Sequence, residues 1–176
     1  MKLIENEKPK GEILLDGLKI YVEYKKGDKK TGVNKATGEE WTREFFVHYG
    51  YFDGVPAPDG DNLDVYIKPK SRSNRPVYVF HNLTPTGDKF DEDKVFLGCN
   101  NLDEAKILWN KHCHAPDIMF GGVSVFTIEE FKNILDKIDD NNKCVIASKD
   151  NFNYLKNNNL LPENLTSLAF NEYLEI

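Results

Sequence analysis

The chain has few cysteines and no long apolar run. Only three of its 176 residues are cysteines, and the spacing of Cys99, Cys113 and Cys144 matches neither a disulfide framework nor a zinc finger. No apolar stretch approaches the roughly 20 residues that a membrane helix needs, and the first residues lack the basic and apolar regions of a signal peptide. We therefore expect a cytoplasmic protein with reduced thiols and no membrane partner.

The chain also lacks an excess of basic residues, because its formal net charge is -6. Proteins that bind nucleic acid by neutralising phosphates usually carry a basic face, so nucleic acid is not the expected partner.

The length and the 40% hydrophobic content allow a core that needs no disulfide staples, and they suit one domain better than two.

The first half of the chain has the pattern of short strands separated by turns. We predict strands at residues 12–15, 18–24, 45–52, 63–67, 76–83 and 95–97. The polar, glycine-containing residues 25–40 are predicted as a long irregular or hairpin connection. Short strands with frequent turns are typical of a small closed or partly closed antiparallel β-barrel.

From about residue 101 the apolar residues follow a helical period. A helix is predicted after Asn101, and a second one follows the capping box that Thr127 and Glu130 form. A late strand at 144–147 and a short helix at 151–157 are predicted further on. The expected class is α+β with flanking C-terminal helices, in which residues 1–140 form the functional domain and residues 141–176 an appendage packed on it.

Three carboxylates lie within six positions in the sequence Asp59-Gly60-Asp61-Asn62-Leu63-Asp64. Anions this close repel one another, and a cation between them removes that repulsion. An EF-hand is excluded because Asp64 stands where its loop needs glycine. Mg²⁺ prefers carboxylate oxygens and takes further ligands from substrate phosphates. The alternative is a solvated acidic turn.

A second acidic block spans residues 86–94 and contains four acids and two lysines. As an isolated block it is typical of a charged hairpin tip. If it faces the first cluster, the two loops would hold metal ions together, with a lysine near the phosphates.

Three other motifs have simpler explanations. The sequence His112-Cys113-His114 is a poor soft-metal site, because residues two apart do not share a helix face and no second ligand pair is present. Gly121-Gly122 is predicted as a turn or a close-packing point rather than a phosphate cradle. Trp41 and Trp109 are predicted as core or rim aromatics.

The sequence Tyr49-Gly50-Tyr51, followed by residues 59–65, resembles the signature of the soluble, Mg²⁺-dependent inorganic pyrophosphatases of family I. The block from Gly87 to Gly98 is similar to the compact form of that family found in phages and prophages, and the resemblance covers roughly residues 12–136. It implies an OB-like pyrophosphatase fold, a catalytic domain over residues 1–140, and hydrolysis of pyrophosphate to two phosphates with Mg²⁺, for which Mn²⁺ can substitute.

The resemblance also assigns roles to individual residues. The metal ligands it implies are Glu23, Asp59, Asp64 (bridging two ions), and Asp88 together with Asp91 or Glu92. The catalytic residues it implies are Asp61 as general base, Tyr49 beside the attacking water, and Lys94 on the phosphate. The further phosphate-binding residues it implies are Arg43 and a lysine among Lys25, Lys29 and Lys30.

Two other functions stay open from the sequence. The Tyr-Lys pair near the C-terminal end of cellular members has no match here. The substrate could therefore be a different phosphoanhydride, such as a nucleoside polyphosphate or a phosphorylated metabolite. A non-catalytic interaction module of the same fold is the second alternative, although the intact acids and Lys94 disfavour it. The oligomeric state is left open, with a homo-oligomer allowed.

Overall fold

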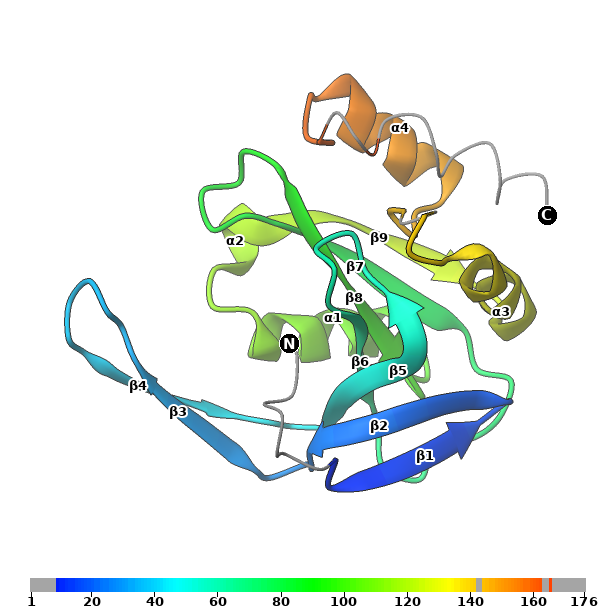
Figure 1. Ribbon diagram of the computed structural model, residues 1–176, viewed down its shortest axis with the longest axis horizontal. Coiled ribbons are helices and arrows are strands. Elements are labelled where there is room, and N and C mark those ends of the chain that lie inside the picture. The colour runs from blue at the N-terminus through cyan, green and yellow to red at the C-terminus, as the bar shows by residue number, and fades with distance from the viewer. Residues whose placement is uncertain (1–8, 142–143, 163–164, 166–176) are drawn as a thin grey trace.

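A seven-stranded sheet forms the centre of the computed structural model, which describes residues 9–141, 144–162 and 165 (Figure 1). The strands are β1 (Gly11–Leu15), β2 (Leu18–Tyr24), β3 (Lys29–Val33), β4 (Glu40–Glu44), β5 (His48–Pro56), β6 (Asn62–Ile67), β7 (Val77–Leu83), β8 (Phe90–Leu97) and β9 (Phe120–Phe126). The helices are α1 (Leu102–His112), α2 (Pro116–Met119), α3 (Ile128–Lys137) and α4 (Lys149–Asn157). The sheet order is β1-β2-β5-β6-β8-β7-β9, and β3 pairs with β4 alone.

The predicted antiparallel barrel is confirmed only in part. Strands dominate and helices follow them, but β1 and β9 lie at opposite edges of the strand order, so the sheet is open across the described residues. In addition, β6 and β8 are parallel. The reason is the position of β8: it enters the sheet between β6 and β7, which are consecutive in the sequence.

Side-chain alternation along the strands gives the sheet two buried faces. On one face, Val65 and Val95 belong to the core cluster that includes Phe131 of α3. On the other face, Tyr66 and Phe96 belong to the cluster that includes Trp109 of α1. Burial on both faces explains why the central strands contain long apolar runs.

The helix starts predicted after Asn101 and Thr127 are confirmed, whereas the helix predicted at 151–157 begins two residues earlier, at Lys149. The Asn101 side chain accepts a hydrogen bond from the backbone N–H of Glu104, and Thr127 and Glu130 form the reciprocal capping box. No helix within the described residues is long and apolar enough to span a membrane.

The polar connection at residues 25–40 is largely a β-hairpin that projects from the body (Figure 1). Gly32 lies opposite Trp41 across the hairpin, and a Cβ atom at Gly32 would come within 2.3 Å of the indole ring. The missing side chain therefore lets Trp41 lie against the neighbouring strand. Two positions nearer the base, Lys30 lies opposite Arg43.

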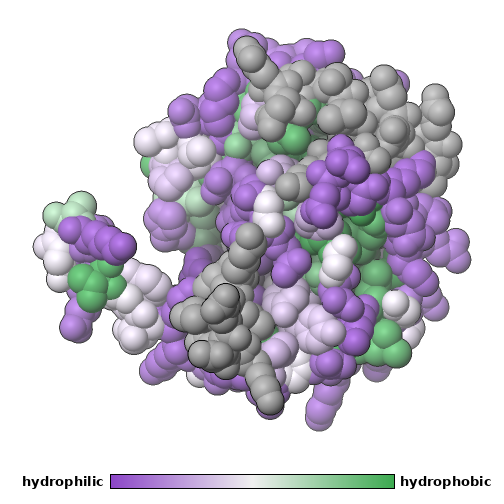
Figure 2. Space-filling model, in the orientation of Figure 1, coloured by the Kyte–Doolittle hydropathy of each residue, from purple (hydrophilic) through white to green (hydrophobic). Residues whose placement is uncertain are grey.

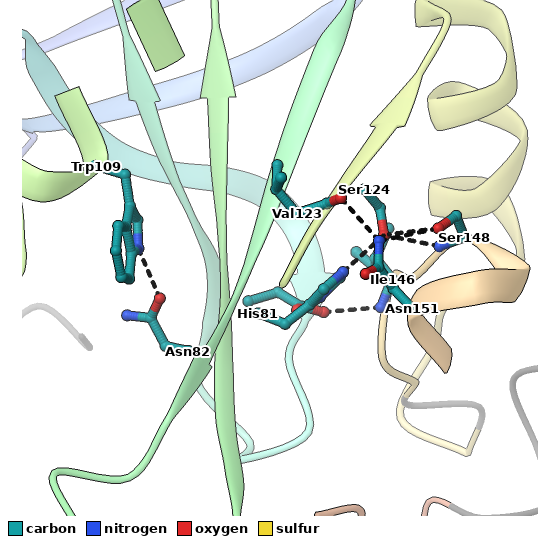
Figure 3. Close-up of polar contacts among 9 residues, drawn as sticks. His81, Asn82, Trp109, Val123, Ser124, Ile146, Ser148 and Asn151 are labelled. Atoms are coloured by element: carbon teal, nitrogen blue, oxygen red, sulfur yellow. Dashed lines mark hydrogen bonds and ion pairs between the residues drawn. The ribbon is translucent and has the colours of Figure 1, made fainter. Parts of the chain in front are cut away.

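A buried polar network joins β8 to the C-terminal segment (Figure 3). The His81 Nδ1–H donates to Asp93 at 2.6 Å, and the Ser124 hydroxyl lies 2.7 Å from His81 Nε2. The other carboxylate oxygen of Asp93 accepts the backbone N–H of Ile146 at 2.7 Å, and Ser148 N–H donates to Ser124. Each polar group thereby gains the partner that burial requires.

Apolar contacts hold the same segment. Phe152 and Leu155 of α4 pack with Leu83 and Phe90, which end β7 and begin β8. The predicted appendage thus contacts the acidic β7–β8 connection through its described residues, whereas residues 142–143, 163–164 and 166–176 lie outside the description. The domain boundary at residue 140 stays a prediction.

One local prediction was wrong. Residues 144–147 are buried but form no strand, because the backbone N–H of Ile146 bonds the Asp93 carboxylate rather than a neighbouring strand. Of the two alternatives predicted for Gly121-Gly122, a turn or a close-packing point, the structure supports the second, because both glycines lie within β9. Close packing explains these glycines, since a Cβ atom at Gly121 would lie 2.6 Å from the carbonyl oxygen of His81.

We predict that Asp93→Ala lowers the free energy of unfolding by roughly 2–4 kcal/mol, because it leaves the buried Nδ1–H of His81 and the buried backbone N–H of Ile146 without partners. His81→Ala should cost a similar amount, and the double variant less than the sum. Urea denaturation measures all three, with the exposed Asp53→Ala as control. A loss below about 0.5 kcal/mol in Asp93→Ala would contradict the prediction.

Candidate active site

The parallel pairing of β6 and β8 brings Asp64 opposite Lys94. The Lys94 ammonium lies 2.5 Å from an Asp64 carboxylate oxygen and 3.1 Å from a Glu92 oxygen. The side chains of Lys94 and Asp64 are 13% and 5% exposed. A buried cation between two carboxylates removes much of their mutual repulsion, so this trio is the centre of the site.

Tyr49 of β5 adjoins this trio. Its ring centroid lies 5.6 Å from the Lys94 nitrogen, and burial holds the pKa of the Tyr49 hydroxyl well above its usual range. Burial alone lowers the pKa of Lys94, but Tyr49, Asp64 and Glu92 outweigh it and raise that pKa well above its usual value. Lys94 is therefore a permanent cation at working pH.

Glu23 lies at the end of β2, beside an irregularity in the pairing between Val22 and Tyr24. Its carboxylate is buried, and its Oε1 atom has no hydrogen-bond partner among the described residues. The pKa of Glu23 is raised from 4.5 to about 7. Burial is the main cause and the charge of Asp64 adds to it, whereas Lys30 and Lys94 oppose the shift. An unpartnered buried oxygen next to a second carboxylate suits a cation.

Asp59 and Asp61 lie in and at the end of the β5–β6 connection. Asp59 is exposed and accepts the backbone N–H of Asp61 at 2.9 Å, whereas Asp61 itself is half-buried. Partial burial raises the pKa of Asp91, and the nearby charge of Asp59 raises it further. The charge of Asp59 in the first acidic cluster therefore acts on Asp91 in the second block, and a metal site shared by the two loops stays a prediction.

Asp88 is placed differently. It is exposed in the turn between β7 and β8, where its carboxylate accepts hydrogen bonds from the hydroxyls of Thr84 and Thr86. These bonds lower its pKa. Of the acids in the second block, Glu92 is the one whose carboxylate contacts Lys94 directly.

The basic residues divide in the same way. Arg43 lines a pocket of ≈ 260 Å³ together with Asp91, Glu92 and Lys94. The Arg43 guanidinium donates to the backbone carbonyl of His112 at 2.8 Å, which holds it at the pocket wall. Two cations and two carboxylates at one pocket suit a phosphate–metal ligand.

The three lysines near the hairpin lie further out. The Lys30 nitrogen lies 5.7 Å from the Tyr24 ring centroid, and its charge acts on Glu23. Lys25 is exposed in the β2–β3 turn, where its backbone N–H donates to Asp28. Lys29 is exposed at the start of β3. Lys30 is therefore the lysine of the three whose charge is seen to act on a site carboxylate, Glu23.

The structure adds pocket residues that the sequence did not indicate. Asn82 and Tyr66 line the pocket, and Asn82 accepts the indole N–H of Trp109 at 2.8 Å (Figure 3). A polar residue inside the apolar β7 run was the available signal. His112 is a supporting residue rather than a metal ligand, because its Nδ1–H donates to Leu108 O and its Nε2 accepts the N–H of Phe46.

In the part of the chain that the structure describes, no three His, Cys, Asp or Glu side chains converge as a ready-made metal site. Lys94 lies between Asp64 and Glu92, so its ammonium holds the position that a shared cation would take. The donor set nevertheless fits a hard divalent ion, because Asp64 and Glu92 share Lys94, the charge of Asp64 acts on Glu23, and one buried oxygen of Glu23 has no partner.

The family model for inorganic pyrophosphatase matches residues 2–136, well over half of the chain. The chain belongs to the inorganic pyrophosphatase family. Members of family I depend on metal ions in general. No curated protein sequence matches the chain.

Solved structures of inorganic pyrophosphatases also match the chain. The Neisseria gonorrhoeae pyrophosphatase is 18% identical, with 76% of this chain and 95% of that chain covered at a TM-score of 0.42. The Helicobacter pylori pyrophosphatase is 13% identical, with 68% and 89% covered at a TM-score of 0.39. At these scores the family assignment depends on the sequence match. The likeness to the phage-borne form stays a prediction.

The buried carboxyl of Glu23 predicts a pH-dependent stability of the metal-free pyrophosphatase. Its folded pKa of about 7 exceeds the ordinary 4.5, so its stabilising contribution is complete below about 4.5 and is lost as the pH rises through about 7. Between pH 5 and 8, Glu23 should lower the free energy of unfolding of the wild type by on the order of 1–3 kcal/mol, and Glu23→Gln should lack this decrease. Chemical denaturation in EDTA measures it, and parallel pH profiles for both proteins would contradict it.

Proposed function

We propose that this pocket hydrolyses inorganic pyrophosphate to two phosphate ions with Mg²⁺, or with Mn²⁺ in its place, in the cytoplasm. Family membership supports the reaction. The observation that supports the location is the grouping of Asp64, Glu92 and the unpartnered Glu23 oxygen around the Lys94 ammonium, beside a pocket lined by Arg43.

The cations of the chain would bind and orient the substrate. Lys94 and Arg43 line the same pocket and would contact phosphate oxygens, with Arg43 held in place through the carbonyl of His112. Lys30, opposite Arg43 on the hairpin, is the outer candidate for the same role. Tyr49 would keep Lys94 in position, since its buried hydroxyl stays protonated.

Glu23, Asp64 and Glu92 would hold the divalent ion, with Asp59 and Asp91 on its outer side. When bound, Mg²⁺ would neutralise phosphate charge and acidify the attacking water. Asp88, engaged with two threonines, is the weakest of the six proposed ligands.

Asp61 would accept the proton. The water oxygen forms a bond to one phosphorus, the bond from that phosphorus to the bridging oxygen breaks, and the second phosphate leaves with the electron pair. Asp61 lies three residues before Asp64 in the sequence and is half-buried, so solvent would be available to take the proton from it afterwards.

We predict that the protein releases phosphate from pyrophosphate in the presence of Mg²⁺, and that Asp61→Asn lowers kcat by about 10²–10⁴-fold without changing Tm. A malachite-green assay measures the phosphate, and Asp53→Asn is the matched exposed control. Absence of phosphate release from folded wild-type protein would refute the proposed function, and a near-normal rate in Asp61→Asn would remove that residue from the base role.

Metal binding is testable without turnover. At a Mg²⁺ concentration 100 times Kd, binding should stabilise the wild type by about 2.7 kcal/mol and raise Tm accordingly. Glu23→Gln and Glu92→Gln should lose most of this shift, whereas Asp88→Asn should keep it because its carboxylate serves the turn. Thermal unfolding with and without Mg²⁺ measures the effect. A shift lost in Asp88→Asn and kept in Glu92→Gln would exchange the two assignments.

A further inference from the structure

A second, larger groove adjoins the catalytic pocket. It has a volume of ≈ 650 Å³ and lies between the base of the β3–β4 hairpin and the end of α1. The residues that line both the groove and the catalytic pocket are Arg43, His112, Cys113 and His114. A ligand with its phosphates beside Lys94 would therefore extend directly into this groove.

Two aromatic rings line the groove while exposed to solvent. Trp41 is 43% and Phe46 37% exposed. Trp41 is held against Gly32, so its indole is already positioned before a ligand arrives. Figure 2 shows the projecting hairpin standing clear of the body, where neighbouring elements do not cover it. Exposed planar rings beside a pocket are typical of a surface on which a flat ligand stacks.

The charge of the groove is opposite to that of the whole chain. Its lining contains the permanent cations of Arg43 and Lys111 but only one carboxylate, Glu44, whereas the chain carries a net charge of -6. The Lys111 nitrogen lies 5.0 Å from the Phe46 ring centroid, so a cation and an aromatic ring occur together. This combination favours a ligand that is both anionic and aromatic.

We propose that the groove binds the base and sugar of a nucleoside polyphosphate whose terminal phosphates occupy the catalytic pocket. This inference rests on the proposed function, because it uses the same phosphate site. The groove volume falls within the roughly 300–1,000 Å³ of small-molecule pockets, whereas pyrophosphate needs only the smaller pocket. Stacking of one base on an aromatic side chain contributes about 1–3 kcal/mol.

The reaction on this second substrate class follows the same chemistry. The water oxygen bonds to the terminal phosphorus, the bond from that phosphorus to the bridging oxygen breaks, and the bridging oxygen leaves with the electron pair on the shortened nucleotide. One proton is released. A nucleoside triphosphate thus gives a nucleoside diphosphate and phosphate, with water as the only co-reactant.

The test compares two substrates across variants from two separate elements. Wild-type protein should release phosphate both from pyrophosphate and from at least one of ATP, GTP, CTP and UTP. Trp41→Ala on the hairpin and Lys111→Ala on α1 should each lower kcat/KM for the nucleotide about 10-fold, and leave kcat/KM for pyrophosphate within about two-fold. Val33→Ala, an exposed apolar change on the same hairpin outside the groove, should alter neither.

Binding provides a readout that needs no turnover. ADP should quench the fluorescence of Trp41 in the wild type and in Asp61→Asn, and inorganic pyrophosphate should not. Trp41→Phe, which keeps the buried Trp109 as the remaining tryptophan, should lose the quenching. Asp61→Asn should also lower the hydrolysis of both substrates by the same factor of about 10²–10⁴, which excludes a contaminating nucleotidase.

The possible failures are distinguishable. If the protein hydrolyses pyrophosphate but neither cleaves any of the four nucleotides nor binds ADP, the groove inference is wrong and the proposed function stands. If nucleotide cleavage occurs but is unchanged in both Trp41→Ala and Lys111→Ala, the groove is not the binding surface. If ADP binds normally but neither substrate is cleaved, the proposed function is wrong, and so is the inference that the groove is part of a substrate site.

Discussion

The buried ammonium of Lys94 allows the acidic residues of this protein to lie together inside a folded chain. Taking Asp64 into the interior is expensive in solvation free energy, and removing one partner of such a buried pair typically costs about 3–5 kcal/mol. The cation therefore has two functions in the metal-free protein. It neutralises Asp64 and Glu92, and it keeps them close enough to act as a unit.

This ion cluster depends on the order of the strands. Asp64 and Lys94 lie 30 positions apart in the sequence and meet only because β8 pairs with β6 in parallel. β8 also pairs with β7, whose His81 binds Asp93 on the opposite face of the sheet. Adjacent residues of β8 thus have different roles. Glu92 and Lys94 line the pocket, and Asp93 makes buried hydrogen bonds on the other face of the strand.

Local signals in the sequence predicted what is local in the structure. The acids at 59–64, the capping box at Thr127 and most strands follow from patterns within a few residues. Strand order is not local, and the insertion of β8 between β6 and β7 left no trace in periodicity, so the predicted closed or partly closed antiparallel barrel included neither the parallel pair nor the open edges. The role of Asp93 was hidden for the same reason, because its partners His81 and Ile146 are 12 and 53 positions away.

The hydrogen bond from the backbone N–H of Ile146 to Asp93 has a consequence for biosynthesis. A ribosome delivers β8 well before Ile146, since 53 residues separate the carboxylate from the amide that covers it. Until then Asp93, which lies on the opposite side of β8 from Glu92 and Lys94, lacks the hydrogen bond from the backbone N–H of Ile146. During synthesis, docking of the residues around Ile146 and α4 can therefore only follow the emergence of β8, and a nascent chain stalled before residue 144 would present the pocket strands without these contacts.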